Sequence, residues 1–150
     1  MSDRHLIGLV RERFNEAIAQ ANITTTTSGA SNLLTQVPSG YVIPAAKLPV
    51  IYVLLTQENV VERSNQTEMR SLRFDVGLVV QEKGEPQDQL EELQLGVELA
   101  IAGSNQLGGI ALACRYLGCE IVQHQGEYQV GRRNLKFEII LSMTANDPRV

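Results

Sequence analysis

Residues 71–78 alternate between apolar and polar or small side chains, and this period constrains the fold more than any other feature of the sequence. A period of two is typical of a strand with one face buried and the other in water, as in antiparallel sheets. The buried face is expected to carry Leu72, Phe74, Val76, Leu78 and Val80. The opposite face carries Ser71, Arg73, Asp75 and Gly77.

The segment before this strand predicts its hairpin partner. Residues 48–55 form an apolar run in which Pro49 suits the first position of a strand, where no ladder hydrogen bond is lost. The polar residues 56–68 are interpreted as a long hairpin turn that leads back into the alternating strand.

Two further strands are expected near the C-terminal end. Residues 110–122 predict a strand or a short helix–strand unit, interrupted by Gly118. Gly126 marks a hairpin, after which residues 128–143 alternate again. Together the segments predict a four-stranded, mainly antiparallel sheet.

An amphipathic helix is expected over residues 3–21, with Ser2 or Asp3 capping its first amide groups. Its apolar residues recur at steps of three and four and form one stripe. This stripe consists of Leu6, Val10, Phe14, Ala17 and Ile18.

A second helix is expected over residues 87–102. Its core-facing stripe consists of Leu90, Leu93, Val97 and Ile101. Leu95 and Leu99 fall on a different side, so the helix is either enclosed within the domain or placed against a neighbouring subunit. With both helices packed on one face of the sheet, residues 1–150 form a single α+β domain.

Between the first helix and the first strand lies an insert, residues 22–47, without a clear period. A connection of this length is unusual in a compact domain and indicates either a mobile surface loop or a segment that orders on binding. Apolar residues such as Leu34 and Tyr41 favour the second interpretation, because a free loop has little reason to carry them.

Composition narrows the class of function. The formal net charge of −4 argues against a protein that grips nucleic-acid phosphates or an anionic membrane. No apolar run is long enough to span a bilayer, and the polar start is not a secretory signal, so we expect a protein of the cytoplasm with reduced cysteines.

The sequence contains few residues in a pattern typical of catalysis or metal binding. Cys114, Cys119 and His124 invite a metal-site interpretation, but on one extended strand the two cysteines, five positions apart, are expected to point to opposite faces. Asp75 with Glu138 is expected to lie on a solvated face and not to form a catalytic pair. We therefore expect no enzyme activity, no cofactor and no metal.

One small basic spot suggests a contact between subunits. Arg132 and Arg133 precede the last strand, and we interpret them as one half of an inter-subunit salt bridge. The acidic half is expected to come from Glu58, Glu62 or Glu68.

The order and lengths of these segments resemble the tail terminator proteins of long-tailed bacteriophages, the minor tail protein U family. The resemblance covers residues 3–21 and 48–144 and lies in the layout, not in a single motif. Its parts are the helix over residues 6–18, the strand Leu-Pro-Val-Ile-Tyr-Val-Leu-Leu at 48–55, the acidic stretch 58–68, the alternating strand 72–80, the Leu- and Glu-rich helix 88–102, Gly-Cys-Glu-Ile-Val at 118–122 and Phe-Glu-Ile-Ile-Leu-Ser-Met at 137–143. The insert at residues 24–47 is longer than the family pattern.

The resemblance implies a homo-hexameric ring in the virion, at the neck-proximal end of the tail, made and assembled in the host cytoplasm. The ring would cap the tail tube protein, stop its polymerisation and present a surface to the head–tail connector or neck proteins. Genomic DNA would pass through the lumen without specific binding, and no membrane would be involved. The residues expected at subunit or tube interfaces are Leu34, Tyr41, Glu58, Val60, Glu62, Glu68, Leu95, Leu99, Arg132 and Arg133.

Two alternatives remain open at this point. One is another head–tail joining or tail-completion protein. The other is a small ferredoxin-like domain that binds a ligand as a dimer and acts in regulation.

Overall fold

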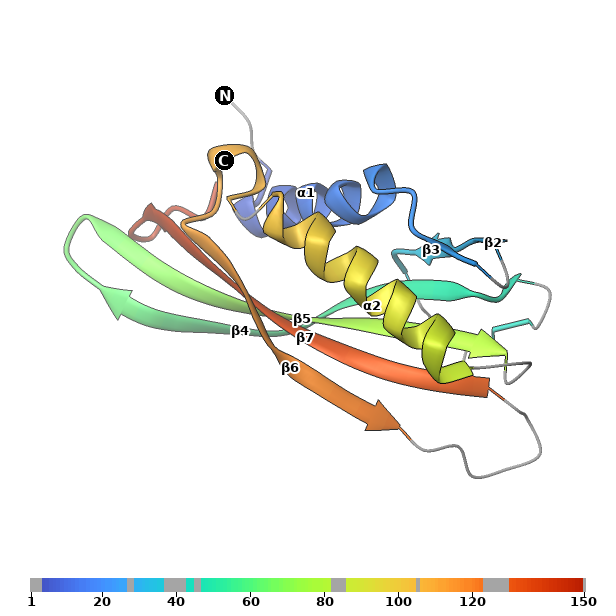
Figure 1. Ribbon diagram of the computed structural model, residues 1–150. Helices are drawn as coiled ribbons and strands as arrows, with labels where there is room; N and C mark the ends of the chain where they lie inside the picture. Colours follow the sequence, from blue (N-terminus) through green and yellow to red (C-terminus); the bar gives the residue numbers. More distant parts are fainter. Residues whose placement is uncertain are drawn as a thin grey trace.

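The computed structural model describes residues 4–26, 29–36, 43–44, 47–81, 86–104, 106–122 and 130–149. Two helices, α1 (Leu6–Gln20) and α2 (Pro86–Ala102), lie against a five-stranded sheet (Figure 1). The strands follow the order β3 (Asn32–Leu34), β4 (Val50–Arg63), β5 (Thr67–Gln81), β7 (Val130–Thr144) and β6 (Ala113–Val122). A small second sheet pairs β1 (Thr24–Thr25) with β2 (Gly29–Ala30), and a 3-10 turn, η2 (Leu107–Gly109), precedes β6.

The α+β class and the mainly antiparallel sheet are confirmed, but the main sheet has five strands and not four. The extra strand, β3, comes from the insert that was expected to be a loop, and it pairs in parallel with the start of β4. Glu92 on α2 fixes the other end of the insert, because its carboxylate accepts hydrogen bonds from the backbone and the hydroxyl of Thr26, both at 2.7 Å. Tyr41 lies outside the described residues.

The hairpin between β4 and β5 was predicted with a turn that is too long. The strands continue to Arg63 and restart at Thr67, so the turn is only residues 64–66. The polar residues from Thr56 to Arg63 belong to β4 and are all exposed. Polarity there reflects a part of the strand that no helix covers, and it does not mark a turn.

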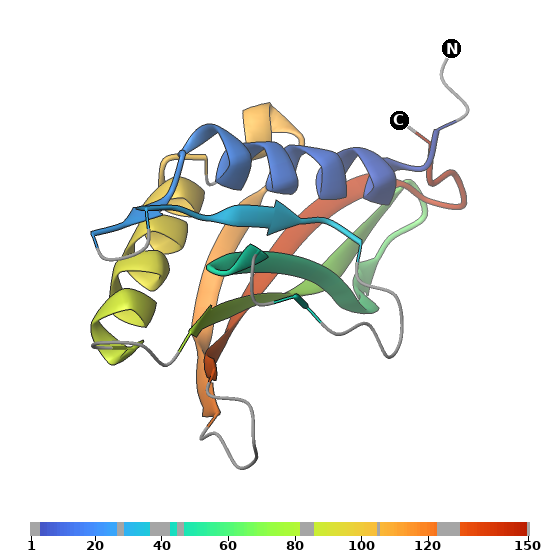
Figure 2. The ribbon, with the colours of Figure 1, turned by 90° about the vertical axis from the view of Figure 1, so that its right-hand side faces the viewer.

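The core lies between the helices and one face of β5 and β7, which carries the predicted alternating apolar residues. Figure 2 shows both helices on that face. Phe14 of α1 stacks on Phe74 of β5 with ring centroids 4.7 Å apart and contacts Phe137 of β7 edge-on at 5.8 Å. The predicted stripe of α2 is also buried in this core.

Helix α1 begins later than predicted, at Leu6, and its cap is His5. The imidazole Nδ1 of His5 accepts the hydrogen bond of the Ile7 amide at 3.0 Å. The expected caps, Ser2 and Asp3, lie outside the described residues. The two ends of the described chain meet here, because His5 forms a bridge with Arg149 and the Leu6 amide donates to the Pro148 carbonyl at 2.7 Å.

The expectation for the two cysteines is wrong. A β-bulge between Tyr116 and Gly118 shifts the register of β6 by one residue, so Cys114 faces Ile139 and Cys119 faces Leu135 across the strand pair. Both cysteines therefore lie on the helix-covered face, where they are half-buried against the core.

Candidate assembly surfaces

The main sheet has two edges without a partner strand in the described parts of the chain. Strand β6 is outermost on one side along its whole length. On the other side β3 covers only Val50–Tyr52, so the edge of β4 is uncovered from Val53 onward. The two edge strands, β4 and β6, run in opposite directions, because each neighbouring pair from β4 through β5 and β7 to β6 is antiparallel.

Exposed apolar side chains gather at these two edges. Of the eight large apolar residues that the described chain exposes, six lie on the uncovered part of β4, on β6 or directly before β6. These six are Val60, Val61, Leu112, Tyr116, Leu117 and Ile121. Only Val60 was among the residues singled out in the sequence, because the outermost position of β6 depends on the sheet order and has no local signature.

The two edges match in height across the sheet. Asn59 on β4 and Ala113 on β6 lie in one row of paired residues, and Leu55 and Tyr116 lie in another. The exposed valines of β4 directly follow Asn59, and the exposed Leu112 directly precedes Ala113. The apolar ends of both edges therefore stand at the same level.

A cluster of ion pairs stiffens the uncovered part of the β4–β5 hairpin. Arg70 binds Glu58 at 2.5 Å and Glu68 at 3.3 Å, and Arg63 binds Glu68 at 2.6 Å. The hydrogen bond from Arg63 is the largest influence on Glu68 and, with that from Arg70, lowers the pKa of its carboxyl below the usual value. Glu68 is only 2% exposed, so its carboxylate is engaged within the chain, whereas Glu62 is exposed.

The two arginines predicted as a pair point to opposite faces of β7. Arg133 lies on the helix-covered face and donates to Gln94 at 2.8 Å and to Gln87 at 3.0 Å, both on α2. Arg132 is exposed on the other face and has no ion-pair partner among the described residues. Their pairing with acidic residues of another subunit remains a prediction.

Leu95 and Leu99 stand on the outer side of α2 and are 59% and 62% exposed. They border an open groove of about 700 Å³ between α2 and residues 21–26. Gly96 forms part of its wall, where Ile23 packs so closely that a Cβ on Gly96 would stand 2.7 Å from the Ile23 Cγ2. Leu34, in β3, is half-buried.

The face of the sheet opposite the helices carries a charge network, which we call the open face network. Glu138 is 8% exposed, accepts a hydrogen bond from Ser71 at 2.9 Å, and pairs with Arg115 and, at 3.5 Å, with Arg73. Burial raises the pKa of Glu138, but the hydrogen bonds from Ser71 and Arg115 outweigh this effect, and the pKa is lowered. The expectation that Glu138 is solvated is therefore wrong, because ion pairs from the neighbouring strands enclose it.

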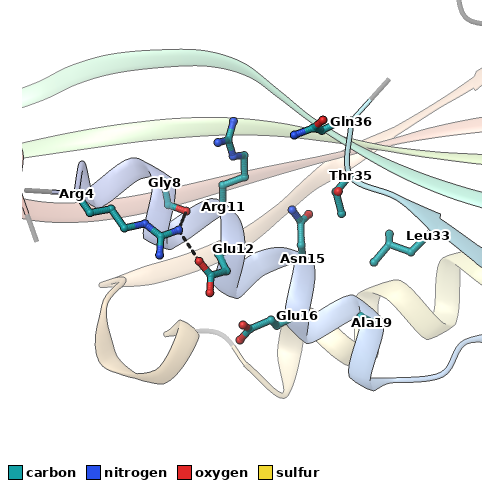
Figure 3. A pocket seen from close by; sticks show the side chains of 10 residues that line it. All are labelled: Arg4, Gly8, Arg11, Glu12, Asn15, Glu16, Ala19, Leu33, Thr35 and Gln36. Atoms are coloured by element: carbon teal, nitrogen blue, oxygen red, sulfur yellow. Dashed lines mark hydrogen bonds and ion pairs between the residues drawn. The ribbon is translucent and has the colours of Figure 1, made fainter. Parts of the chain in front are cut away.

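A second hollow, of about 340 Å³, lies between α1 and the segment that continues β3 (Figure 3). Arg4 pairs with Glu12 in its wall, and Arg11 extends away from that pair. Arg11 has no ion-pair partner in the described residues, and the Oδ1 atom of Asn15 is buried without a hydrogen bond. The hollow thus presents one exposed cation, Arg11, that has no ion-pair partner among the described residues.

Within the described ranges, no group of three or more His, Cys, Asp or Glu side chains is placed to hold a metal ion. His124 lies outside these ranges. None of the described helices has the length and apolar character needed to cross a bilayer. The sequence matches no model of a known protein family and no curated protein.

Proposed function

We propose that this chain is a structural subunit that joins copies of itself head to tail, with β6 of one copy beside β4 of the next, into a closed ring. The observation that carries the proposal is the pair of uncovered sheet edges with their exposed apolar residues. An exposed apolar edge pairs with another chain unless something blocks it. Each β6–β4 contact leaves the same two edges at the ends of the row, so the row grows until it closes.

The geometry of the edges favours this arrangement. When neighbouring copies are related by rotation about an axis along the strands, the β4 strands of all copies run the same way. Strand β6 then meets the next β4 in antiparallel orientation, the pairing with the better hydrogen-bond geometry. At equal height, Val60 and Val61 of one copy come next to Leu112 of its neighbour.

The ring, combined with the sequence resemblance, leads us to propose a tail terminator. About six copies would cap the tail tube, end its polymerisation and offer the opposite rim to connector or neck proteins. We place the β4–β5 hairpin with Glu58, Val60 and Glu62 at one of these rims, because it extends beyond the helices (Figure 1). In this proposal the protein belongs to the virion and acts without catalysis or cofactor.

The open face network supports passage of DNA without specific binding, provided that this face lines the ring. Arg73 and Arg115 are paired with Glu138, and Lys136 is paired with Asp75 at 3.5 Å. Cations that are already paired attract phosphate groups less than unpaired ones do. A lumen of this kind would hold DNA weakly except near Arg132, which is exposed on the same face and has no ion-pair partner among the described residues.

The ring is tested by sedimentation velocity and negative-stain electron microscopy of the purified protein. Leu112→Lys places a charge directly before β6, opposite Val60 and Val61 of the neighbouring copy, and is expected to weaken association about 10-fold or more, because a charged edge resists strand pairing. Ser142→Lys is the matched control, since it puts the same charge on an exposed site of an interior strand. A wild-type protein that remains monomeric at about 1 mM contradicts the proposal. A stable dimer instead favours the ligand-binding regulatory domain.

The terminator role is tested in particles assembled without this protein. Tails of uncontrolled length are expected, because nothing stops the tube. Tails of normal length that fail to join heads would identify a joining or completion protein instead.

A further inference from the structure

The two helices lie on the same face of the sheet but toward opposite edges. The outer flank of α1 faces the β3 side, where it forms the hollow of Figure 3 with Leu33 and Gln36. The outer flank of α2 faces the β6 side, where Gln94 donates a hydrogen bond to the Tyr116 hydroxyl at 3.2 Å. In the proposed ring, on which this inference rests, the α2 flank of one copy therefore faces the α1 flank of the next.

Each flank presents one charge without an ion-pair partner among the described residues, and the two charges are opposite. On α2, Glu91 pairs with Arg133 at 3.7 Å and Glu92 binds Thr26, which leaves Glu98 on the β6 side. Glu98 lies next to Gln94, which donates to its carboxylate at 3.2 Å, and it has no ion-pair partner in the described chain. On the α1 flank, Arg11 is likewise without an ion-pair partner among the described residues and stands at the hollow.

Both charges also stand at the same height along the strands. Phe74 and Phe137 are directly paired across β5 and β7, and they mark one level of the sheet. Phe14 stacks at this level on the α1 side, and Tyr116 contacts Phe137 at this level on the α2 side.

From that level, Arg11 and Glu98 are displaced in the same direction. Arg11 lies about one turn from Phe14 toward the start of α1, which is bonded to Pro148 beyond the end of β7. Glu98 lies about one turn beyond Gln94, on the side away from the start of α2. The start of α2 packs against Gly131, near the beginning of β7. Both displacements lead toward the end of β7.

We propose that the hollow between α1 and β3 is the socket for the α2 flank of a second copy of this chain, with an ion pair between Arg11 and Glu98 across the interface. This contact adds a helix layer to the shared sheet and fixes the height of one copy against the next.

The test is a charge exchange followed by sedimentation velocity. Arg11→Glu and Glu98→Arg are each expected to weaken ring formation about 10-fold, because like charges then meet at the interface. The double exchange is expected to restore association to near the wild-type level. Arg13→Glu is the control, because Arg13 is on the same helix but faces η2 instead of the hollow. Unchanged circular dichroism and melting temperature verify that each variant is folded.

The outcomes separate this inference from the proposed function. If Arg11→Glu assembles as well as Arg13→Glu while Leu112→Lys does not assemble, the ring stands and the socket is wrong. If both single exchanges weaken the ring and the double exchange does not restore it, the pairing of Arg11 with Glu98 is wrong. If the wild-type protein forms no head-to-tail oligomer, the proposed function fails and the socket fails with it.

Discussion

Replacing Gly96 by alanine tests how tightly α2 is held against the end of α1. The added Cβ would stand 2.7 Å from Cγ2 and 3.0 Å from Cγ1 of Ile23, well inside ordinary contact distance. Ile23 is only 8% exposed and therefore has little room to move aside. Overpacking of this kind costs about 1–3 kcal/mol. The better helix propensity of alanine returns about 1 kcal/mol, so we expect a net loss of about 1 kcal/mol.

Gly8→Ala is a matched control on the other helix. Its Cβ would have only flexible atoms of Arg4 nearby, the closest being Nε at 3.5 Å, which is ordinary contact. This variant is expected to gain up to about 1 kcal/mol from helix propensity. The two variants should thus differ by about 2 kcal/mol in the free energy of unfolding.

The measurement is urea unfolding followed by circular dichroism, because the chain has no tryptophan for fluorescence. A change in midpoint with an unchanged slope reports stability. A loss of 1 kcal/mol also lowers the melting temperature by about 2–4 °C for a domain of this size. If Gly96→Ala raises the midpoint as much as Gly8→Ala does, Ile23 does not restrain α2 and the reasoning is refuted.

Three further predictions concern burial and ionisation. Leu93→Ala should lower the free energy of unfolding by about 2–5 kcal/mol. Leu99→Ala, on the exposed side of the same helix, should change the free energy of unfolding of the monomer by less than about 0.5 kcal/mol. Equal losses in urea unfolding would contradict the packing of α2. The pKa of Glu138 is lowered on folding, so its carboxylate stabilises the fold above the ordinary pKa of 4.5, and this effect is lost as the pH falls through the folded pKa. The melting temperature should therefore fall more between pH 6 and pH 3 for the wild type than for Glu138→Gln. Equal pH profiles would show that Glu138 is not held as described. Burial raises the pKa of Cys114 from 9.0 to about 11, so alkylation of this thiol in the folded protein at pH 8 should be about 100-fold slower than in urea, and equal rates would show that it is exposed.

Local periodicity predicted the main strands and both helices, and non-local contacts decided the rest. The alternation in β5 and β7 and the stripes of α1 and α2 arise from burial on one face, so they are visible in the sequence. Strand β3 has only three residues, too few to show a period, and it exists because its backbone pairs with β4.

The errors at the cysteines and at the hairpin have local physical causes. The bulge between Tyr116 and Gly118 places the side chain of Cys119 on the same face of the sheet as that of Cys114. A bulge cannot be inferred from a count of positions. The polar half of β4 lies where no helix covers it, so a strand there carries the same residue types as a turn.

The candidate surfaces were predictable only in part. Leu95 and Leu99 were found because a helix with apolar residues on two sides cannot bury both against one sheet, and both are exposed. Leu117 and Ile121 were missed, because an apolar residue on a strand has the same local pattern in the middle of a sheet as at its edge. The sequence predicted an acidic partner for Arg133 in the β4–β5 hairpin, but the side chains that Arg133 contacts lie on α2.

The bridge between His5 and Arg149 determines where added segments leave the molecule. Both ends of the described chain stand at one corner, close to the hairpin turn, because the amide of Ala145 donates to the carbonyl of Gln66 at 3.0 Å. A purification tag or fluorescent protein fused at either terminus would project from this corner. In a closed assembly every such fusion would crowd a single rim and leave the opposite rim accessible, so labelled particles would reveal in electron micrographs which way the assembly is oriented.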